Sequence, residues 1–301
     1  MSLTSGAIEA LPVPPSILGE SPFWHPDEQR LYWVDIPGRR LNAFDPRSQQ
    51  HDQWGFDTEP GSCAPLLDGG LLIAMRDGLW RFDPQSGVRS QVAPPPYDPA
   101  RQRFNDGKAD AQGRFWVGTL DDRREPEAAL YRYARGRIER MAEGITVSNG
   151  LGFSPDGRTL YWSDTKAHAV QAFDVDAQDG SLSRRRLFRQ FPPRAAGESL
   201  ASYGGRPDGA AVDSEGAYWC AMFEGQRLLR LSPQGELLVE LPLPVRCPTM
   251  PCFGGADLKT LYITTAREKR PADELAQQPL AGCVLQLRVA VPGLPVQFAR
   301  L

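Results

Sequence analysis

The sequence lacks the features that mark membrane and nucleic-acid-binding proteins. No window reaches the roughly 18 apolar residues that a membrane-spanning helix requires, and the first 15 residues do not combine a cationic start with an apolar stretch. The 34 Lys and Arg residues do not outnumber the 37 Asp and Glu residues, and the longest basic run is residues 184–186. We therefore expect a cytoplasmic protein with neither a membrane nor a nucleic-acid partner.

Cysteine is scarce and irregularly spaced. The five cysteines are Cys63, Cys220, Cys247, Cys252 and Cys283. An odd number without a regular pattern favours reduced, buried thiols over a disulfide framework. Cys247 and Cys252 form the only close pair, and no second Cys or His pair follows that would complete a structural zinc site.

Histidine and the common catalytic motifs are also rare or missing. The chain has three histidines, no Gly-x-Ser-x-Gly motif and no glycine-rich phosphate-binding loop. A serine hydrolase or a nucleotide-binding enzyme would need these features. His25 and His168 lie beside turns, where we expect solvent contact or hydrogen bonding rather than catalysis.

Turn-forming residues, in contrast, are abundant. The 29 glycines and 28 prolines make up about 19% of the chain, against about 12% in average proteins. Hydrophobic residues (41%) and charged residues (24%) are close to the average of soluble globular proteins, which excludes disorder, coiled coil and collagen. Many short strands joined by tight turns would use residues in this way.

One phrase recurs six times along the chain: an Asp/Gly turn followed by a short apolar strand. Its plainest copy is Ser-Pro-Asp-Gly-Arg-Thr-Leu-Tyr-Trp-Ser-Asp at residues 154–164. The equivalent strand positions are Tyr32, Leu72, Phe115, Tyr161, Tyr218 and Tyr262. The steps between them are 40, 43, 46, 57 and 44 residues, near the ~40–50 residues of one four-stranded propeller blade.

A second strand with alternating polar and apolar residues follows most copies of the phrase. The only convincing helical pattern is residues 271–278, so a sheet built from βαβ units is excluded. We predict an all-β fold, a six-bladed β-propeller with a central channel, as a single domain over residues 1–301. Two β-sandwiches would not explain one phrase that recurs from end to end.

Most residues of the repeat have a structural explanation. Asp68, Asp156 and Asp213 are expected in hairpin turns, since Asp-Gly favours two-residue turns. The repeat tryptophans and tyrosines are expected to pack between blades. Residues 184–186 are expected on a solvated strand face.

Three polar side chains stand just before copies of the phrase, where the chain enters the innermost strand of a blade. They are Glu20, Asn149 and Asp208. One such residue alone would more often belong to a turn. Three at equivalent positions of separate blades would converge on the channel and form an oxygen-only site for a divalent ion.

A second polar group is the phrase Arg-Phe-Asn-Asp-Gly-Lys at residues 103–108, before the third copy. Its aromatic and aliphatic neighbours suggest burial. A buried arginine needs a carboxylate or a polyhydroxylated ligand as partner.

These phrases resemble the SMP-30/gluconolactonase/regucalcin family of sugar lactonases. The matches are Leu-Gly-Glu-Ser-Pro at 18–22, the phrase at 103–108, Gly-Thr at 118–119, Ser-Asn-Gly at 148–150 and Pro-Asp-Gly at 207–209. They follow the family order over essentially the whole chain. The resemblance implies a six-bladed propeller with one divalent metal ion in its channel, which hydrolyses the ester bond of aldonolactones.

The resemblance also implies roles for single residues. Glu20, Asn149 and Asp208 would bind the metal, and Arg103 and Asn105 would contact hydroxyl groups of a small-molecule sugar lactone. Asp122 is our prediction for a further acidic substrate contact, with Asp121 and Glu125 as alternatives in the same segment.

The expected mechanism follows from the chemistry of such a metal ion. The ion would polarise the lactone carbonyl and lower the pKa of a bound water, with Asp208 as general base. The oxygen-only set admits Ca²⁺, Mg²⁺, Mn²⁺ or Zn²⁺. The alternative functions are an esterase or phosphotriesterase that uses the same metal ion, and a non-catalytic propeller that serves as a calcium-binding platform. A closed propeller of this length can act as a monomer.

Overall fold

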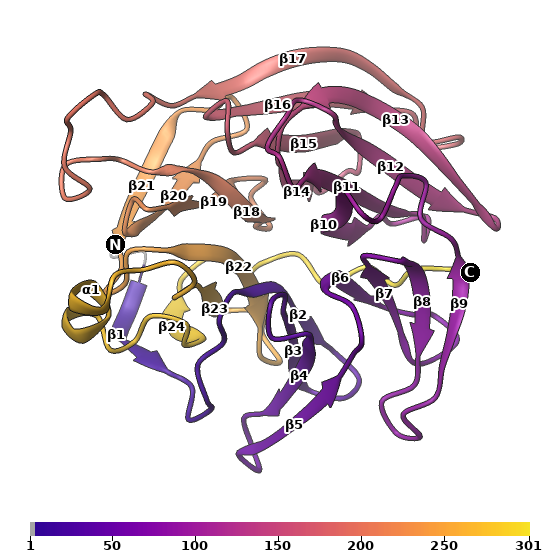
Figure 1. Cartoon of the computed structure of the whole chain (residues 1–301), viewed down its shortest axis with the longest axis horizontal. Coiled ribbons are helices and arrows are strands. Elements are labelled where there is room, and N and C mark those ends of the chain that lie inside the picture. The colour runs from indigo at the N-terminus through magenta and orange to yellow at the C-terminus, as the bar shows by residue number, and fades with distance from the viewer. Residues whose placement is uncertain (1–3) are drawn as a thin grey trace.

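The computed structural model describes residues 4–301, which form six four-stranded antiparallel sheets around a central axis (Figure 1). Each sheet is one blade, and in five of the six blades the first strand in the sequence lies innermost. The predicted all-β, six-bladed β-propeller is confirmed.

Five blades are each formed by four consecutive strands. Blades 1 and 2 contain β2 (Gly19–His25), β3 (Arg30–Asp35), β4 (Arg40–Asp45), β5 (Gln50–Gly55), β6 (Pro60–Pro65), β7 (Leu71–Met75), β8 (Gly78–Phe82) and β9 (Arg89–Ala93). Blades 3 and 4 contain β10 (Gln102–Ala109), β11 (Phe115–Asp121), β12 (Ala128–Ala134), β13 (Arg137–Ile145), β14 (Ser148–Phe153), β15 (Thr159–Asp164), β16 (Ala169–Val175) and β17 (Leu182–Gln190). Blade 5 contains β18 (Arg206–Val212), β19 (Tyr218–Phe223), β20 (Arg227–Leu231) and β21 (Leu237–Pro242).

The sixth blade joins the two ends of the chain. It contains β22 (Pro248–Gly254), β23 (Thr260–Thr265), β24 (Leu285–Val289) and, as the outermost strand, β1 (Thr4–Ala10). β1 pairs antiparallel with β24, with Glu9 opposite Gln286. This pairing closes the ring, and the sequence analysis did not predict it. The single helix of the described residues, α1 (Ala272–Gln277), lies within the predicted helical segment.

The repeated phrase forms the turn into the second strand of each blade. In four copies a tryptophan follows the equivalent aromatic residue, and all four are buried: Trp33, Trp116, Trp162 and Trp219. Each buried indole N–H needs an acceptor. The acceptor is a serine hydroxyl in blades 1 and 4 and the turn aspartate in blades 3 and 5.

Asp213 is therefore more than the simple turn residue that the sequence suggested. Its side chain is completely buried and accepts hydrogen bonds from Trp219 Nε1 (2.9 Å) and Arg230 Nε (2.8 Å). It also accepts from the backbone N–H of Ala217 (3.0 Å). Asp156, in the corresponding turn of blade 4, is exposed, and its side chain accepts from the backbone N–H of Arg158 within that turn.

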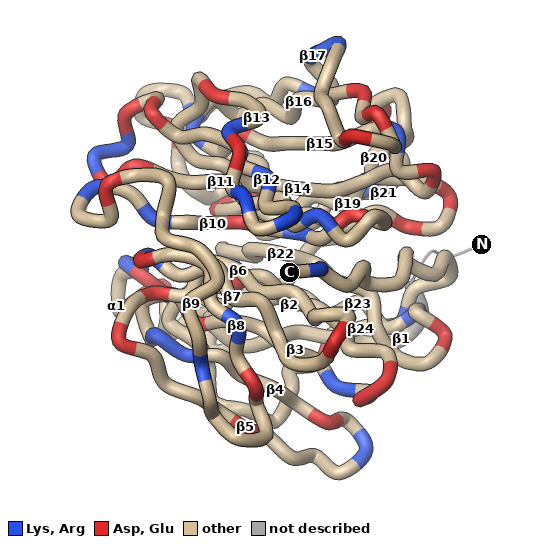
Figure 2. The backbone as a smooth tube through the Cα atoms, turned by 90° about the vertical axis from the view of Figure 1, so that its right-hand side faces the viewer, with Lys and Arg blue, Asp and Glu red and all other residues tan. Residues whose placement is uncertain are grey.

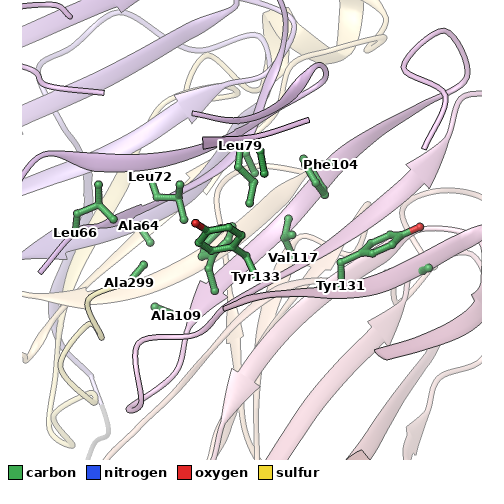
Figure 3. Close-up of a cluster of buried hydrophobic side chains, with 14 residues drawn as sticks. Ala64, Leu66, Leu72, Leu79, Phe104, Ala109, Val117, Tyr131, Tyr133 and Ala299 are labelled. Carbon is green, nitrogen blue, oxygen red and sulfur yellow. The ribbon is translucent and has the colours of Figure 1, made fainter. Parts of the chain in front are cut away.

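The hydrophobic core lies between neighbouring blades rather than in one central mass. Figure 3 shows the cluster between blades 2 and 3, in which Leu72 and Leu79 meet Phe104 and Val117. These side chains are fully buried, and each stabilises the fold by about 1.5–3 kcal/mol relative to an exposed position. The ring thus consists of wedges that are held together by side chains of adjacent sheets.

The last residues of the chain cross one end of the channel (yellow in Figure 1). The N–H of Leu294 donates to the carbonyl of Val212 (3.3 Å) in blade 5, and the N–H of Ala299 donates to that of Pro65 (2.8 Å) in blade 2. The segment 292–301 therefore ties distant blades together and leaves the opposite end of the channel for the site described below.

Two other sequence-based predictions concern the charge of the surface and the state of the cysteine thiols. Basic and acidic segments are interspersed along the chain (Figure 2), as the near-balanced composition suggested. All five cysteines are free and buried, which confirms the prediction of reduced thiols. Within residues 4–301, no helix has both the length and the apolarity that crossing a membrane demands.

Candidate active site

The sequence-predicted polar residues meet at one end of the channel. Glu20, Arg103, Asn105, Asn149 and Asp208 all line a cavity of about 230 Å³, which we call the polar pocket. They come from four innermost strands: β2, β10, β14 and β18. All five side chains are buried.

Irregular strand geometry aims these side chains into the channel. The pairing of the innermost strand with its neighbour shifts register directly after Glu20, after Asn149 and on both sides of Asp208. Such a bulge turns side chains away from the regular alternation of a strand. Ser21, which follows Glu20, is held in the left-handed backbone region (φ 48°), a strain typical of functional sites.

The bulge after Asn149 needs a glycine. Gly150 also has a left-handed backbone (φ 59°), and a Cβ there would lie 2.3 Å from the hydroxyl oxygen of Tyr218. The Tyr218 hydroxyl donates to the Gly150 carbonyl (2.8 Å). Blade 5 thus fixes the bulge of blade 4, and with it the position of Asn149.

A continuous hydrogen-bond chain joins the two polar groups that the sequence analysis treated separately. Arg103 Nη1 donates to Asn105 Oδ1 (2.7 Å), and Asn105 Nδ2 donates to Asn149 Oδ1 (2.7 Å). Asn149 Nδ2 then donates to Asp208 Oδ1 (2.6 Å). Two expected substrate-binding residues, Arg103 and Asn105, therefore form one network with two expected metal-binding residues, Asn149 and Asp208. Moving one member disturbs the others.

The carboxylates of this pocket are strongly affected by burial. Burial, together with the nearby charges of Asp208 and Asp106, raises the pKa of Glu20 well above its ordinary value. Burial and the charge of Asp106 raise the pKa of Asp208 to about 8, against the lowering effects of Arg206 and Arg103. Burial therefore disfavours the charged forms of both carboxyl groups, because no close ion pair compensates them within the described residues.

The donor set fits a hard divalent cation. Within the described residues, no cationic side chain lies within 4.0 Å, the ion-pair distance, of Glu20 or Asp208. Both residues offer carboxylate oxygens to the channel. A divalent ion prefers such oxygens and would neutralise their repulsion. Asn149 now turns its amide nitrogen toward Asp208, so ligation through its oxygen requires the amide to turn over.

Arg103 is a buried cation without a carboxylate partner among residues 4–301. Its Nη1 donates to the backbone oxygen of Phe104 (2.9 Å) as well as to Asn105. Burial and the charges of Arg124 and Arg76 lower the pKa of its guanidinium to about 10. A buried guanidinium without an anion favours a ligand rich in oxygen acceptors.

Asp122 does not reach the polar pocket. Its carboxylate is about half exposed and pairs with Arg76 Nη1 (3.0 Å) of blade 2. The alternatives Asp121 and Glu125 both pair with Arg101. The residue of this segment that lines the pocket is instead Arg124, so the structure places a cation where the sequence analysis expected an acid.

The sequence analysis missed other residues of the pocket. Thr165 Oγ1 accepts a hydrogen bond from Asn149 Nδ2 (2.8 Å) and donates to the Pro207 carbonyl (2.7 Å). Lys166 and Arg206 line the pocket and add positive charge. Thr165 and Lys166 directly follow the fourth copy of the repeat, and this position was the only signal that could have found them.

Comparisons with known proteins agree with this geometry. Residues 18–267 match the model of the SMP-30/gluconolactonase/LRE-like region. The chain is 46% identical to a 6-deoxy-6-sulfogluconolactonase of Pseudomonas putida, over 93% of this chain and 94% of the relative. It is 36% identical to the regucalcin of Danio rerio, over 92% and 93% of the two chains.

A solved structure shares the whole architecture. The calcium-binding protein regucalcin of Agrobacterium tumefaciens superposes with a TM-score of 0.91 at 28% identity, and 98% of each chain is covered. The family model and the relatives extend across all six blades and include the strands that carry the polar pocket. The resemblance seen in the sequence is thereby confirmed, and the chain belongs to the SMP-30/gluconolactonase/LRE-like family.

Proposed function

We propose that this protein is a metal-dependent lactonase that opens aldonolactones to aldonic acids. The observation that carries the proposal is the buried network from Arg103 to Asp208, with the carboxylate of Asp208 at one end and a buried guanidinium at the other. Membership of the family and the lactonase relative support hydrolysis of a lactone ester.

Glu20, Asn149 and Asp208 would hold the divalent ion. When bound, such an ion supplies Lewis-acid activation of the lactone carbonyl and of water. The family includes proteins described as calcium-binding, which supports a divalent ion in this position. Arg103 and Asn105 would orient the sugar hydroxyls, and the narrow pocket would exclude bulk water.

Asp208 would act as general base and then as general acid. Its carboxylate takes a proton from water as the water oxygen bonds to the lactone carbonyl carbon. The bond between that carbon and the ring oxygen then breaks, and Asp208 returns the proton to the leaving oxygen. The product is the open aldonic acid, which ionises and releases one proton.

Proton release in weakly buffered solution tests this proposal. We expect purified protein to acidify a gluconolactone solution faster than spontaneous hydrolysis. Chelation should abolish the acceleration and a single added divalent ion should restore it, because the carboxylates alone repel each other. Full activity after complete chelation would contradict the metal requirement. No acceleration with any lactone or ion would favour the binding-platform alternative.

We further propose that the preferred lactone carries an acidic substituent. Arg124, Lys166 and Arg206 line the pocket. Among residues 4–301, an acidic partner within 4.0 Å is found for Arg206 alone of these three, Glu224 (3.2 Å). Apart from Glu20 and Asp208, the described lining of the pocket contains one acidic residue, Glu268. The 46%-identical relative is named for a lactone with a sulfonate group, which supports an anionic substituent here.

Neutralising the two unpaired cations should therefore change selectivity. In Arg124→Met and Lys166→Met variants, we expect kcat/KM for a sulfonated gluconolactone to fall about tenfold or more, because a hydrogen bond to a charged group contributes about 1.5–3 kcal/mol. kcat/KM for neutral gluconolactone should change much less. Arg47→Met, which removes an exposed cation of a turn in blade 1 and does not line the pocket, is the matched control. Equal losses for both substrates would contradict an anion subsite.

A further inference from the structure

A second cavity lies at the opposite end of the channel. It has a volume of about 330 Å³ and is lined by the last residues of innermost strands, whereas the polar pocket is lined by the first. We call it the far pocket. The two cavities share no lining residue, and the C-terminal segment 292–301 provides one wall of the far pocket.

The walls of the far pocket are mainly apolar. Its large apolar lining residues are Trp24, Phe153, Val212, Phe253 and Leu294. Trp24, Val212 and Phe253 are largely buried, so the walls are set by packing against the blades. A cavity of this kind excludes a sugar acid, because its hydroxyl groups would find few hydrogen-bond partners. The cavity suits a ligand with a flat apolar ring.

One cation projects into these apolar surroundings. Lys108, on β10, lines the pocket, and its Nζ donates to the Ala210 carbonyl (3.0 Å). Within residues 4–301 no carboxylate lies within 4.0 Å of Nζ. An ammonium group has three donors, so two remain for a ligand.

Among residues 4–301, none of the acidic side chains nearby forms an ion pair with Lys108. Asp106 lies two residues earlier on the strand, and its Oδ2 accepts the Leu151 N–H (2.8 Å). Its Oδ1 has no hydrogen-bond partner among the described residues, and neither oxygen comes within 4.0 Å of the Lys108 Nζ. Asp110 lines the pocket, but its carboxylate is held by Arg114 Nε and Trp116 Nε1. Asp156, the remaining lining acid, is exposed at a turn. Lys108 therefore lacks a direct counter-ion in an apolar cavity.

We propose that the far pocket binds a small organic anion, an aromatic carboxylate whose acid group pairs with Lys108 and whose ring packs on Trp24 and Phe153. The ammonium supplies two hydrogen bonds and the opposite charge, and the apolar walls supply the area that an aromatic ring buries. This site is separate from the polar pocket and does not depend on lactone hydrolysis.

Binding of 2-naphthoate to the intact protein tests the proposal. Titration calorimetry, with quenching of tryptophan fluorescence as a second readout, should show one site per chain. Both Lys108→Met and the uncharged analogue 2-naphthylmethanol should weaken binding about tenfold or more, because each removes the charged hydrogen bond. Lys269→Met, at an exposed lysine, should leave binding unchanged.

Two further variants make each outcome decisive. Arg103→Met removes the buried cation of the polar pocket, so loss of binding in this variant alone would place naphthoate there and overturn the proposal. Val296→Trp fills the far pocket from the C-terminal segment and should abolish binding while Lys108 is intact. Unchanged affinity in Lys108→Met or Val296→Trp, each with a native melting transition, would equally overturn it.

Discussion

Replacing Asp208 by Asn is expected to lower lactone turnover about 10³-fold, within the roughly 10²–10⁴-fold range of general-base catalysis. The amide keeps the size of the side chain but can neither take a proton from water nor supply a negative charge. Asp208 accepts only one hydrogen bond from the network, from Asn149, and an amide oxygen can accept it too. Steady-state kinetics with gluconolactone, at saturating divalent ion, measure the loss.

The same substitution should not destabilise the metal-free protein. Asp208 and Glu20 are buried near each other, and their mutual repulsion and burial penalise the charged forms. Removing one charge relieves this cost, so we expect the chelated variant to melt at or above the wild-type temperature. Glu20→Gln should behave alike, and Asp27→Asn, at an exposed turn, is the control that should change neither activity nor stability.

The pH dependence of stability should distinguish this explanation from a general effect of the amide. The pKa of Asp208 is raised from 3.8 to about 8 in the folded protein, so the folded state binds more protons than the unfolded state between these values. The stability of chelated wild type should therefore fall as pH rises from about 4 to 8, and fall less in Asp208→Asn. A variant that is less stable than wild type at pH 8 would show that the charge is compensated.

The sequence predicted the fold because the pattern that defines a blade is local. An Asp/Gly turn and the aromatic strand after it lie within about ten residues, and the copy at residues 154–164 forms this structure in blade 4. Glu20, Asn149 and Asp208 could be placed together for the same reason. Each stands 10 to 12 residues before the equivalent aromatic position of a copy, so the propeller symmetry brings all three to one end of the channel.

The features that escaped prediction depend on partners distant in sequence. β1 completes the sixth blade by pairing with β24, and no local pattern records that Glu9 faces Gln286. Asp122 was expected as a substrate contact because the family resemblance implied an acidic contact in its segment, but its carboxylate pairs with Arg76 of another blade. Lys108 belongs to a recognised phrase, yet its position at the far end of the channel follows only from the length of β10.

Replacing Asp213 by Ala is expected to cost about 3–5 kcal/mol of folding free energy, the largest stability effect that we predict, because it removes one partner of a buried ion pair. The Arg230 side chain is 7% exposed and would keep only Glu215, which is largely solvent-exposed. The Trp219 indole N–H would lose its acceptor as well. Urea unfolding, followed by tryptophan fluorescence, measures the change.

Asp156→Ala is the control, because it alters an aspartate in the corresponding turn one blade earlier. Asp156 is exposed and accepts hydrogen bonds only from Ser154 Oγ (2.6 Å) and the Arg158 N–H (3.1 Å). The indole of Trp162 in that blade binds Ser148 instead. We therefore expect a loss of about 1 kcal/mol or less, typical of an exposed turn. Similar losses at both positions would mean that the aspartate acts through turn geometry alone, and that the buried contacts with Trp219 and Arg230 contribute little to the stability of blade 5.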